Sequence, residues 1–255
     1  MSIVTLLYPA FILAILLVFI HSIFGLEIIK RGVIFTDLAI GQFASVGVAV
    51  SLLFFDGSYG FILTLIFALL GATLIAVATH RVQNIEAFIG MLYALGASAI
   101  IVLLSNTTQG TELFNKLLAT DILFTTTSDL LEPAILYVFV ASIFFIFYHK
   151  LTGVYKEMLF FGLLALTVTS SVQLAGVLVV FVLLIVPAFL ALLQSKFNRL
   201  VFAWIIGSII IMVAMILSYH FDLPTGYTII FIGSFVGIVL GLIVGKDETS
   251  QKVGE

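Results

Sequence analysis

Long apolar runs separated by short polar connections dominate the chain. A membrane-crossing helix needs roughly 20 mostly apolar residues, and these runs are continuous instead of alternating at period two, as barrel strands would. The pattern predicts an all-α, polytopic helical bundle in a membrane. We expect the first run to be a retained span and not a cleaved signal peptide. The runs lie at residues 5–24, 32–54, 57–79, 86–105, 133–148, 157–194, 198–218 and 224–245.

The composition excludes a soluble protein. Of the 255 residues, 63% are hydrophobic and 9% are charged, whereas soluble chains have about 45–50% apolar and about 25% charged residues. The mean hydropathy is +1.34. The 10 Lys and Arg residues do not outnumber the 13 Asp and Glu residues, so no basic surplus exists to hold a nucleic-acid backbone. There is no Cys, which excludes thiolate metal sites.

The basic residues predict an orientation. By the positive-inside rule, spans are flanked on the cytoplasmic side by Lys and Arg. Only Lys116 departs from this pattern, in an acidic loop with Glu112, Asp121 and Asp129. We therefore expect the N-terminus outside and the C-terminus in the cytoplasm. The residues that set this orientation are Lys30, Arg31, Arg81, Lys150, Lys156, Lys196, Arg199, Lys246 and Lys252.

The run at 157–194 carries basic residues at both ends, so it must begin and finish on the same side. At about 1.5 Å per residue it is ~57 Å long, barely enough for two crossings of a ~30 Å core. This predicts a pair of short helices broken near residues 169–176, whose polar side chains must face protein or water and not lipid. The chain then has eight or nine transmembrane helices in a single domain, residues 1–255.

The second run contains the strongest candidate for chemistry. Asp37 lies about 9 Å and Gln42 about 16 Å beyond Arg31 if the helix is continuous. Asp37, Gly41, Ser45 and Gln42 share one arc of about 140°, and oxygen donors suit hard or borderline divalent cations. Charged residues inside membranes are usually functional, so Asp37 and Gln42 are candidate metal-passage residues. The alternative is that Asp37 pairs with Lys30 or Arg31 and that Gln42 bonds a neighbouring helix.

Other polar and small residues give weaker signals. No two of the four histidines share metal-ligand spacing. His21, His80 and His149 are expected at cytoplasmic span ends, and His220 in an external turn. The last run carries a stripe of small residues, which permits close helix packing, either within this chain or against a second subunit. The stripe consists of Gly233, Gly237, Gly241 and Gly245.

Several segments together resemble the permease subunits of bacterial ABC importers for divalent metals, the zinc, manganese and iron family. No P-loop sequence occurs in the chain, so an ATP-driven system would need a separate ATPase. The resemblance lies in residues 30–47, 86–98, 117–123 and 165–168, in Gly176-Val-Leu-Val-Val180, in Leu184-Ile-Val-Pro-Ala188 and in Asp222-Leu-Pro-Thr-Gly226.

The resemblance implies an assembly. It implies a homodimeric, or pseudo-symmetric, permease in the bacterial cytoplasmic membrane, a cytoplasmic ABC ATPase dimer, and an extracytoplasmic metal-binding protein that delivers cargo. It implies no cofactor in this chain, since ATP is used by the partner, and no enzymatic activity of its own. It also implies that the connection before the penultimate span contacts the ATPase through Gln194, Lys196, Asn198 and Arg199. A short, basic, cytoplasmic connection between two spans can present a helix to a partner; the alternative is that it is a positive-inside anchor and nothing more.

Two departures from the family pattern concern the cargo. The family commonly has Asp-x-x-x-His in the second helix, where Gln42 here stands at the His position and Asp37 is displaced by one residue. A neutral amide is a poorer transition-metal ligand than imidazole. The connection before residue 157 is also short. An ion- or proton-coupled secondary transporter is the alternative function, although only Asp37 qualifies as the ionisable group that such proteins need.

Overall fold

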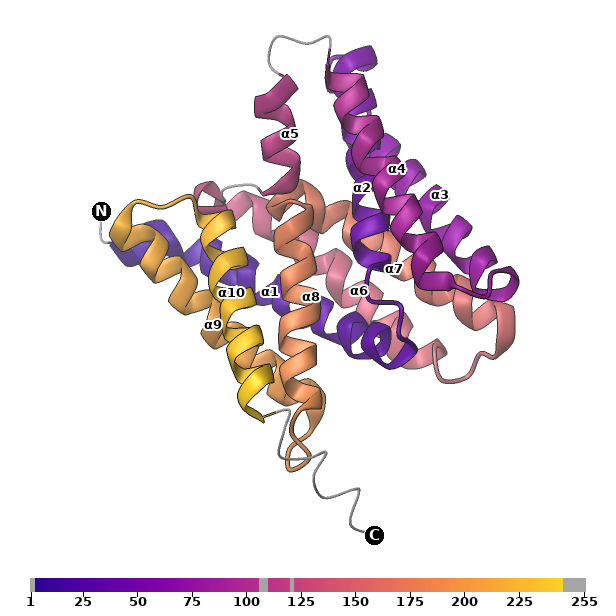
Figure 1. The fold of residues 1–255 in the computed structure, drawn as a ribbon. Helices are drawn as coiled ribbons and strands as arrows, with labels where there is room; N and C mark the ends of the chain where they lie inside the picture. The colour runs from indigo at the N-terminus through magenta and orange to yellow at the C-terminus, as the bar shows by residue number, and fades with distance from the viewer. Residues whose placement is uncertain (1–2, 106–109, 120–121, 245–255) are drawn as a thin grey trace.

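The structure is a computed structural model that describes residues 3–105, 110–119 and 122–244 (Figure 1). Within these ranges it contains helices and no strands, and eight helices are long and apolar enough to cross a membrane. The predicted polytopic α-helical bundle is confirmed. The helices are α1 (Ile3–Arg31), α2 (Thr36–Phe55), α3 (Gly60–Arg81), α4 (Ile85–Leu104), α5 (Gly110–Leu118), α6 (Leu131–Phe147), α7 (Gly153–Ala175), α8 (Val177–Leu192), α9 (Arg199–Phe221) and α10 (Thr225–Val244).

Helix α1 extends further than its apolar run predicted. It continues through seven residues beyond residue 24 and ends with the basic pair Lys30 and Arg31 in its last turn. Cations at a helix C-terminus are favoured by the helix dipole. Gly32 then adopts a φ of 68°, and the chain turns before α2 begins at Thr36. The turn separates Arg31 from Asp37, so the second helix begins at Thr36 and not at residue 32, and the distances predicted along a helix from Arg31 are wrong.

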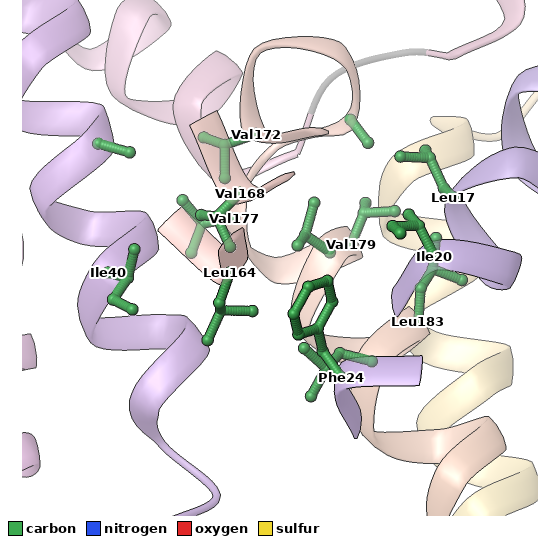
Figure 2. Packing of buried hydrophobic residues seen from close by; sticks show 14 of the residues in the cluster. Leu17, Ile20, Phe24, Ile40, Leu164, Val168, Val172, Val177, Val179 and Leu183 are labelled. Carbon is green, nitrogen blue, oxygen red and sulfur yellow. The ribbon is translucent and has the colours of Figure 1, made fainter. Parts of the chain in front are cut away.

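Helix α2 lies at the centre of the bundle. It packs against α3 and α4 on one side and against α7 and α8 on the other. Figure 2 shows Ile40 of α2 facing Leu164 and Val168 of α7, in the same buried cluster as Val177 of α8. A helix that is apolar all round is a buried one, and α2 is buried along most of its length.

The predicted break in the 157–194 run is confirmed at Gly176. This residue has a φ of 85°, which favours glycine, and an added Cβ would lie 2.7 Å from the backbone of Ala119 at the end of α5. The hydroxyl residues before it are buried as expected: Thr169 donates to the Ala165 carbonyl at 2.8 Å and Ser171 to the Thr167 carbonyl at 2.8 Å. Gln173 is exposed and donates to the Thr64 hydroxyl. Only α8, with 16 residues, is short; α7 has 23 because it starts at Gly153.

The glycine stripe of α10 packs against α8 of the same chain. An added Cβ at Gly233 would meet Val182, at Gly237 Val186, and at Gly241 Phe189. The stripe thus has an intramolecular partner. Gly245 lies outside the described residues, as do Lys246 and Lys252 of the orientation argument.

Between α4 and α6 the chain forms the nine-residue helix α5 and two short 3₁₀ turns, Ile122–Phe124 and Thr127–Leu130. Asp121 of the predicted acidic loop lies outside the described residues. The C-terminal ends of α1, α3, α6 and α8 and the N-terminal ends of α7 and α9 carry the described basic residues other than Lys116. We call this side of the bundle the basic side.

Candidate functional site

Asp37 lies in the first turn of α2, on the basic side of the bundle. Its side chain is enclosed, with 1% of the residue exposed. Gln42 lies about 8 Å deeper along the helix. Both residues are therefore nearer the basic side than the sequence predicted, because the turn at residues 32–35 takes up the length that a continuous helix would have provided.

The two basic residues that could give Asp37 a structural ion pair are paired with other carboxylates. Lys30 approaches Glu27 at 3.6 Å, and Arg31 is paired with Glu157 at 2.5 Å. Neither carboxylate oxygen of Asp37 has a hydrogen-bond partner among the described residues. The alternative prediction, that Asp37 pairs with Lys30 or Arg31, is wrong.

Other polar atoms of α2 are also buried without a hydrogen-bond partner in the described part of the chain. They are the hydroxyl oxygens of Thr36 and Ser45 and the carbonyl oxygen of Gln42. Buried polar groups are bonded in the great majority of cases, so an unbonded set needs an explanation. Together with the Asp37 carboxylate, these atoms lie along one central helix, which suits transient contacts with a desolvated cation better than it suits structural bonding.

The face of α2 that carries Gln42 and the face that carries Gly41 have different neighbours. The Cβ of Gln42 lies 2.8 Å from the position of an added Cβ at Gly96 of α4, whereas Gly41, one turn along the helix from Asp37, lies against Val177 of α8. Across the described residues, no group of three or more His, Asp or Glu side chains gathers as a metal site. The described part of the chain therefore offers isolated oxygen atoms on α2 and no cluster of such side chains.

His21 was placed wrongly from the sequence. It lies ten residues before the end of α1, about 15 Å from that end, and is fully buried. Neither ring nitrogen has a hydrogen-bond partner among the residues described, and the adjacent Ser22 hydroxyl has none either. The signal was present, because the apolar pattern continues past His21 as far as the basic pair that ends the helix. His80 lies in the last turn of α3 and His149 directly after α6, at helix ends as expected. His220 lies in the last turn of α9 and not in the turn that follows, where it was predicted. All three are exposed.

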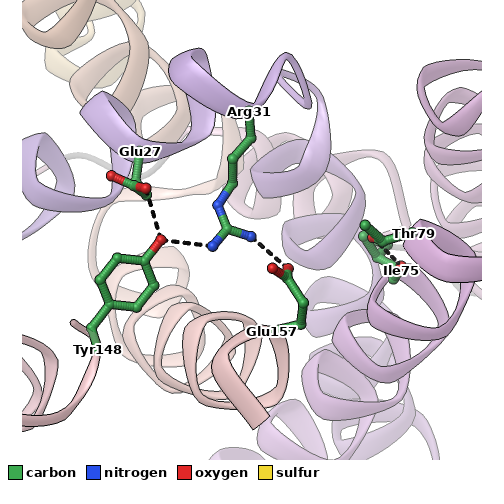
Figure 3. Close-up of polar contacts among 6 residues, drawn as sticks. All are labelled: Glu27, Arg31, Ile75, Thr79, Tyr148 and Glu157. Atoms are coloured by element: carbon green, nitrogen blue, oxygen red, sulfur yellow. Dashed lines mark hydrogen bonds and ion pairs between the residues drawn. The ribbon is translucent and has the colours of Figure 1, made fainter. Parts of the chain in front are cut away.

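A second polar cluster lies at the basic side and is fully bonded (Figure 3). We call it the Arg31 cluster: Arg31, Glu27, Tyr148 and Glu157. Arg31 donates to the Tyr148 hydroxyl at 2.7 Å, and this hydroxyl donates to Glu27 at 2.7 Å. Burial raises the pKa of Tyr148 to about 12, so the phenol keeps its proton. The Arg31 guanidinium also lies 4.1 Å from the ring centroid of Phe160. The cluster joins α1, α6 and α7.

The connection between α8 and α9 separates the predicted ATPase contacts into two kinds. Gln194 accepts from the Phe197 amide at 2.8 Å, and Asn198 caps α9 by accepting from the amides of Leu200 and Val201 at 3.0 and 3.2 Å. These two side chains shape the connection. Lys196 and Arg199 are exposed and take part in no ion pair among the described residues. The connection is a bend, so the expectation that it presents a helix is wrong.

A family model described as "ABC 3 transport family" matches residues 4–244. The chain belongs to the ABC 3 transport family. This match confirms the family resemblance found in the sequence and extends it over nearly the whole multi-pass membrane protein.

Two relatives, both named as metal transport membrane proteins, match the chain over different lengths. The "Manganese transport system membrane protein MntC" of Listeria monocytogenes is 25% identical, over 94% of this chain and 91% of the relative. The "Probable iron transport system membrane protein" of Haemophilus influenzae is 40% identical over 86 residues, so the chain matches only about a third (32%) of that relative's length.

The fold is shared with a solved structure. PsaBC from Streptococcus pneumoniae matches with a TM-score of 0.74 and 22% identity, over 92% of this chain and 91% of that one. At this identity the likeness shows the fold of the ABC 3 transport protein and nothing about its cargo.

Proposed function

We propose that the chain is the permease subunit of an ATP-binding-cassette importer that moves a divalent metal ion, zinc, manganese or iron, across the bacterial cytoplasmic membrane. The observation that carries the proposal is the family match over residues 4–244. The printed names of the relatives, a manganese and an iron transport membrane protein, support the cargo class.

The environment of Asp37 supports a role in cation passage. Burying an unpaired carboxylate costs several kcal/mol. Its position in the first turn of α2 returns about 0.3–1 kcal/mol through the helix dipole. A passing divalent cation would offset the remaining cost by direct attraction. Because the isolated oxygen ligands hold a cation weakly, release can follow entry. Gln42 would supply a neutral oxygen ligand deeper on the path.

A complete path needs more than one chain. The ligands of α2 are too few for a coordination shell, so we propose that two copies of this single-domain permease, residues 1–255, form the path between them. The cargo would be handed over by an extracytoplasmic metal-binding protein. By the positive-inside rule the basic side faces the cytoplasm, with the N-terminus outside and the C-terminus inside.

Energy would come from a separate ATPase dimer that binds the α8–α9 connection. Lys196 and Arg199 are exposed there, and Phe197 is 68% exposed beside them. A basic, partly apolar projection of this kind suits a protein partner. Closure of the ATPase dimer would then move α8 and α9 and open the path alternately to each side. The chain itself uses no cofactor in this scheme.

Reconstitution in lipid vesicles tests the proposal. The chain with its cognate ATPase should take up manganese, zinc or iron only when ATP is present, and the chain alone should show no ATP-dependent uptake. Uptake by the chain alone that follows a proton or sodium gradient would contradict the proposal and favour a secondary transporter. A matched vesicle set with a catalytically inactive ATPase controls for leakage.

A further inference from the structure

A groove of about 430 Å³ lies between α3 and α7 on the basic side of the bundle. On α3 its lining residues recur at spacings of three and four, from Leu69 through Ala72 and Ala76 to His80, with Arg81 at the end, so they form one face of the helix. On α7 the lining includes Met158 and Gly162. The two helix faces leave a channel along the membrane-facing surface, since Leu69 is 39% and Met158 62% exposed.

The two helices are in direct contact elsewhere. Towards the opposite side, the Gln173 amide donates to the Thr64 hydroxyl at 3.0 Å and ties α7 to α3. Near the basic side, small residues widen the gap: an added Cβ at Gly162 would meet nothing within 4 Å. The groove is thus open space between two helices that are bonded together further along.

The dimensions of the groove fit one lipid chain. Twelve residues separate Leu69 from Arg81, which is about 18 Å along the helix. Half of a ~30 Å hydrocarbon core is about 15 Å, so the groove runs from the middle of the bilayer to its surface within one leaflet. An acyl chain of that leaflet can lie along it with its headgroup at the end marked by Arg81.

The charge at that end is positive. His80 and Arg81 are exposed there, and neither takes part in an ion pair among the described residues. Glu157 is the acidic residue in the lining, and its carboxylate is bound by Arg31 at 2.5 Å. The Arg31 cluster therefore removes the charge that would repel an anion. Basic pockets between membrane helices bind anionic lipid headgroups.

We propose that this groove binds one anionic phospholipid of the cytoplasmic leaflet, with an acyl chain between α3 and α7 and its phosphate against Arg81 and His80. The bound acyl chain fills the gap between α3 and α7 on the basic side of the Gln173–Thr64 hydrogen bond. It thereby couples the two helices where they are not bonded to each other. The assignment of the leaflet rests on the orientation proposed above, whereas the binding itself does not depend on transport.

Native mass spectrometry of the full chain in detergent tests the proposal, with phosphatidylglycerol and phosphatidylcholine of identical acyl chains as probes. One phosphatidylglycerol should bind with several-fold preference over phosphatidylcholine. Arg81→Gln should weaken phosphatidylglycerol binding about fivefold and leave phosphatidylcholine unchanged, because one basic side chain near an anionic lipid has an effect of that order. Lys150→Gln, an exposed basic residue outside the groove, should have no such effect.

A pair of glycine variants tests the acyl-chain part. Gly162→Leu should fill the groove and weaken both lipids, whereas Gly90→Leu on α4, where an added Cβ also meets nothing within 4 Å, should not. Equal binding of the two lipids, or no loss in Arg81→Gln, would overturn the proposal. So would a change in the monomer-to-dimer ratio of Gly162→Leu without lipid loss, which would assign the groove to a second copy. Arg81 is exposed, so its variant remains decisive if Gly162→Leu does not fold.

Discussion

Two polar regions of this chain differ in whether their side chains are bonded. In the Arg31 cluster, the cation has both a carboxylate and a phenol partner. Around α2, Asp37, Gln42 and Ser45 are more deeply buried than the ion pair of that cluster but have oxygens without a hydrogen-bond partner among the described residues. A bonded polar group in a membrane protein stabilises the fold, whereas an unbonded one costs free energy and is retained for function. We therefore assign the polar side chains of the Arg31 cluster to the stability of the fold and those of α2 to function.

Breaking the bonded region should have the largest effect. Arg31→Met leaves the Glu157 carboxylate without its partner, and removing one member of a buried pair costs about 3–5 kcal/mol. Both side chains keep some exposure, 18% for Arg31 and 17% for Glu157, so we expect a loss of about 2–3 kcal/mol. Unfolding of the purified protein in detergent measures it.

A double variant distinguishes pairing from packing. Arg31→Met combined with Glu157→Gln should recover much of the stability, because no unpaired charge remains. Glu157→Gln alone completes the comparison. If the stability lost in the double variant equals the sum of the losses in Arg31→Met and Glu157→Gln, the pair is not coupled. This result would remove the basis for calling the region structural.

The α8–α9 connection also contains both kinds of polar side chain: Asn198 is hydrogen-bonded, whereas Lys196 and Arg199 form no ion pair among the described residues. Asn198→Ala removes the cap of α9 and should cost about 1 kcal/mol of stability, with coupling otherwise intact.

Lys196→Ala and Arg199→Ala should leave stability unchanged, since both residues are exposed. Together they should lower ATP-coupled uptake about fivefold through weaker ATPase binding. Uptake that is unaffected in this pair would assign the basic residues to membrane orientation alone.

Gln42→His sharpens the account of the unbonded region. Imidazole is a better ligand for zinc than a neutral amide, so the ratio of zinc to manganese uptake should rise about fivefold. Gln42→Asn keeps the amide and is the control. An unchanged ratio in the histidine variant would place this residue off the ion path.

The helical bundle could be predicted from the sequence because apolar runs and basic flanks act locally. The break at Gly176 also followed from length and charge alone. The Arg31 cluster could not be predicted, since it joins Arg31 to Glu157, 126 residues apart. The burial of His21 was missed because the first run was ended at residue 24 instead of at its basic pair. The helices that pack beside Gln42 and Gly41 could not be predicted either, because helical periodicity gives the face on which a residue lies and not the helix that covers this face.

Asp37→Asn tests the central claim most directly, with uptake and unfolding measured on the same preparation. The amide keeps the shape of the side chain and removes the charge. ATP-driven metal uptake should fall about tenfold or more, and the unfolding temperature should stay the same or rise, because a buried unpaired charge has been removed. Wild-type uptake, or a loss of stability like that of Arg31→Met, would contradict the assignment of Asp37 to cation passage.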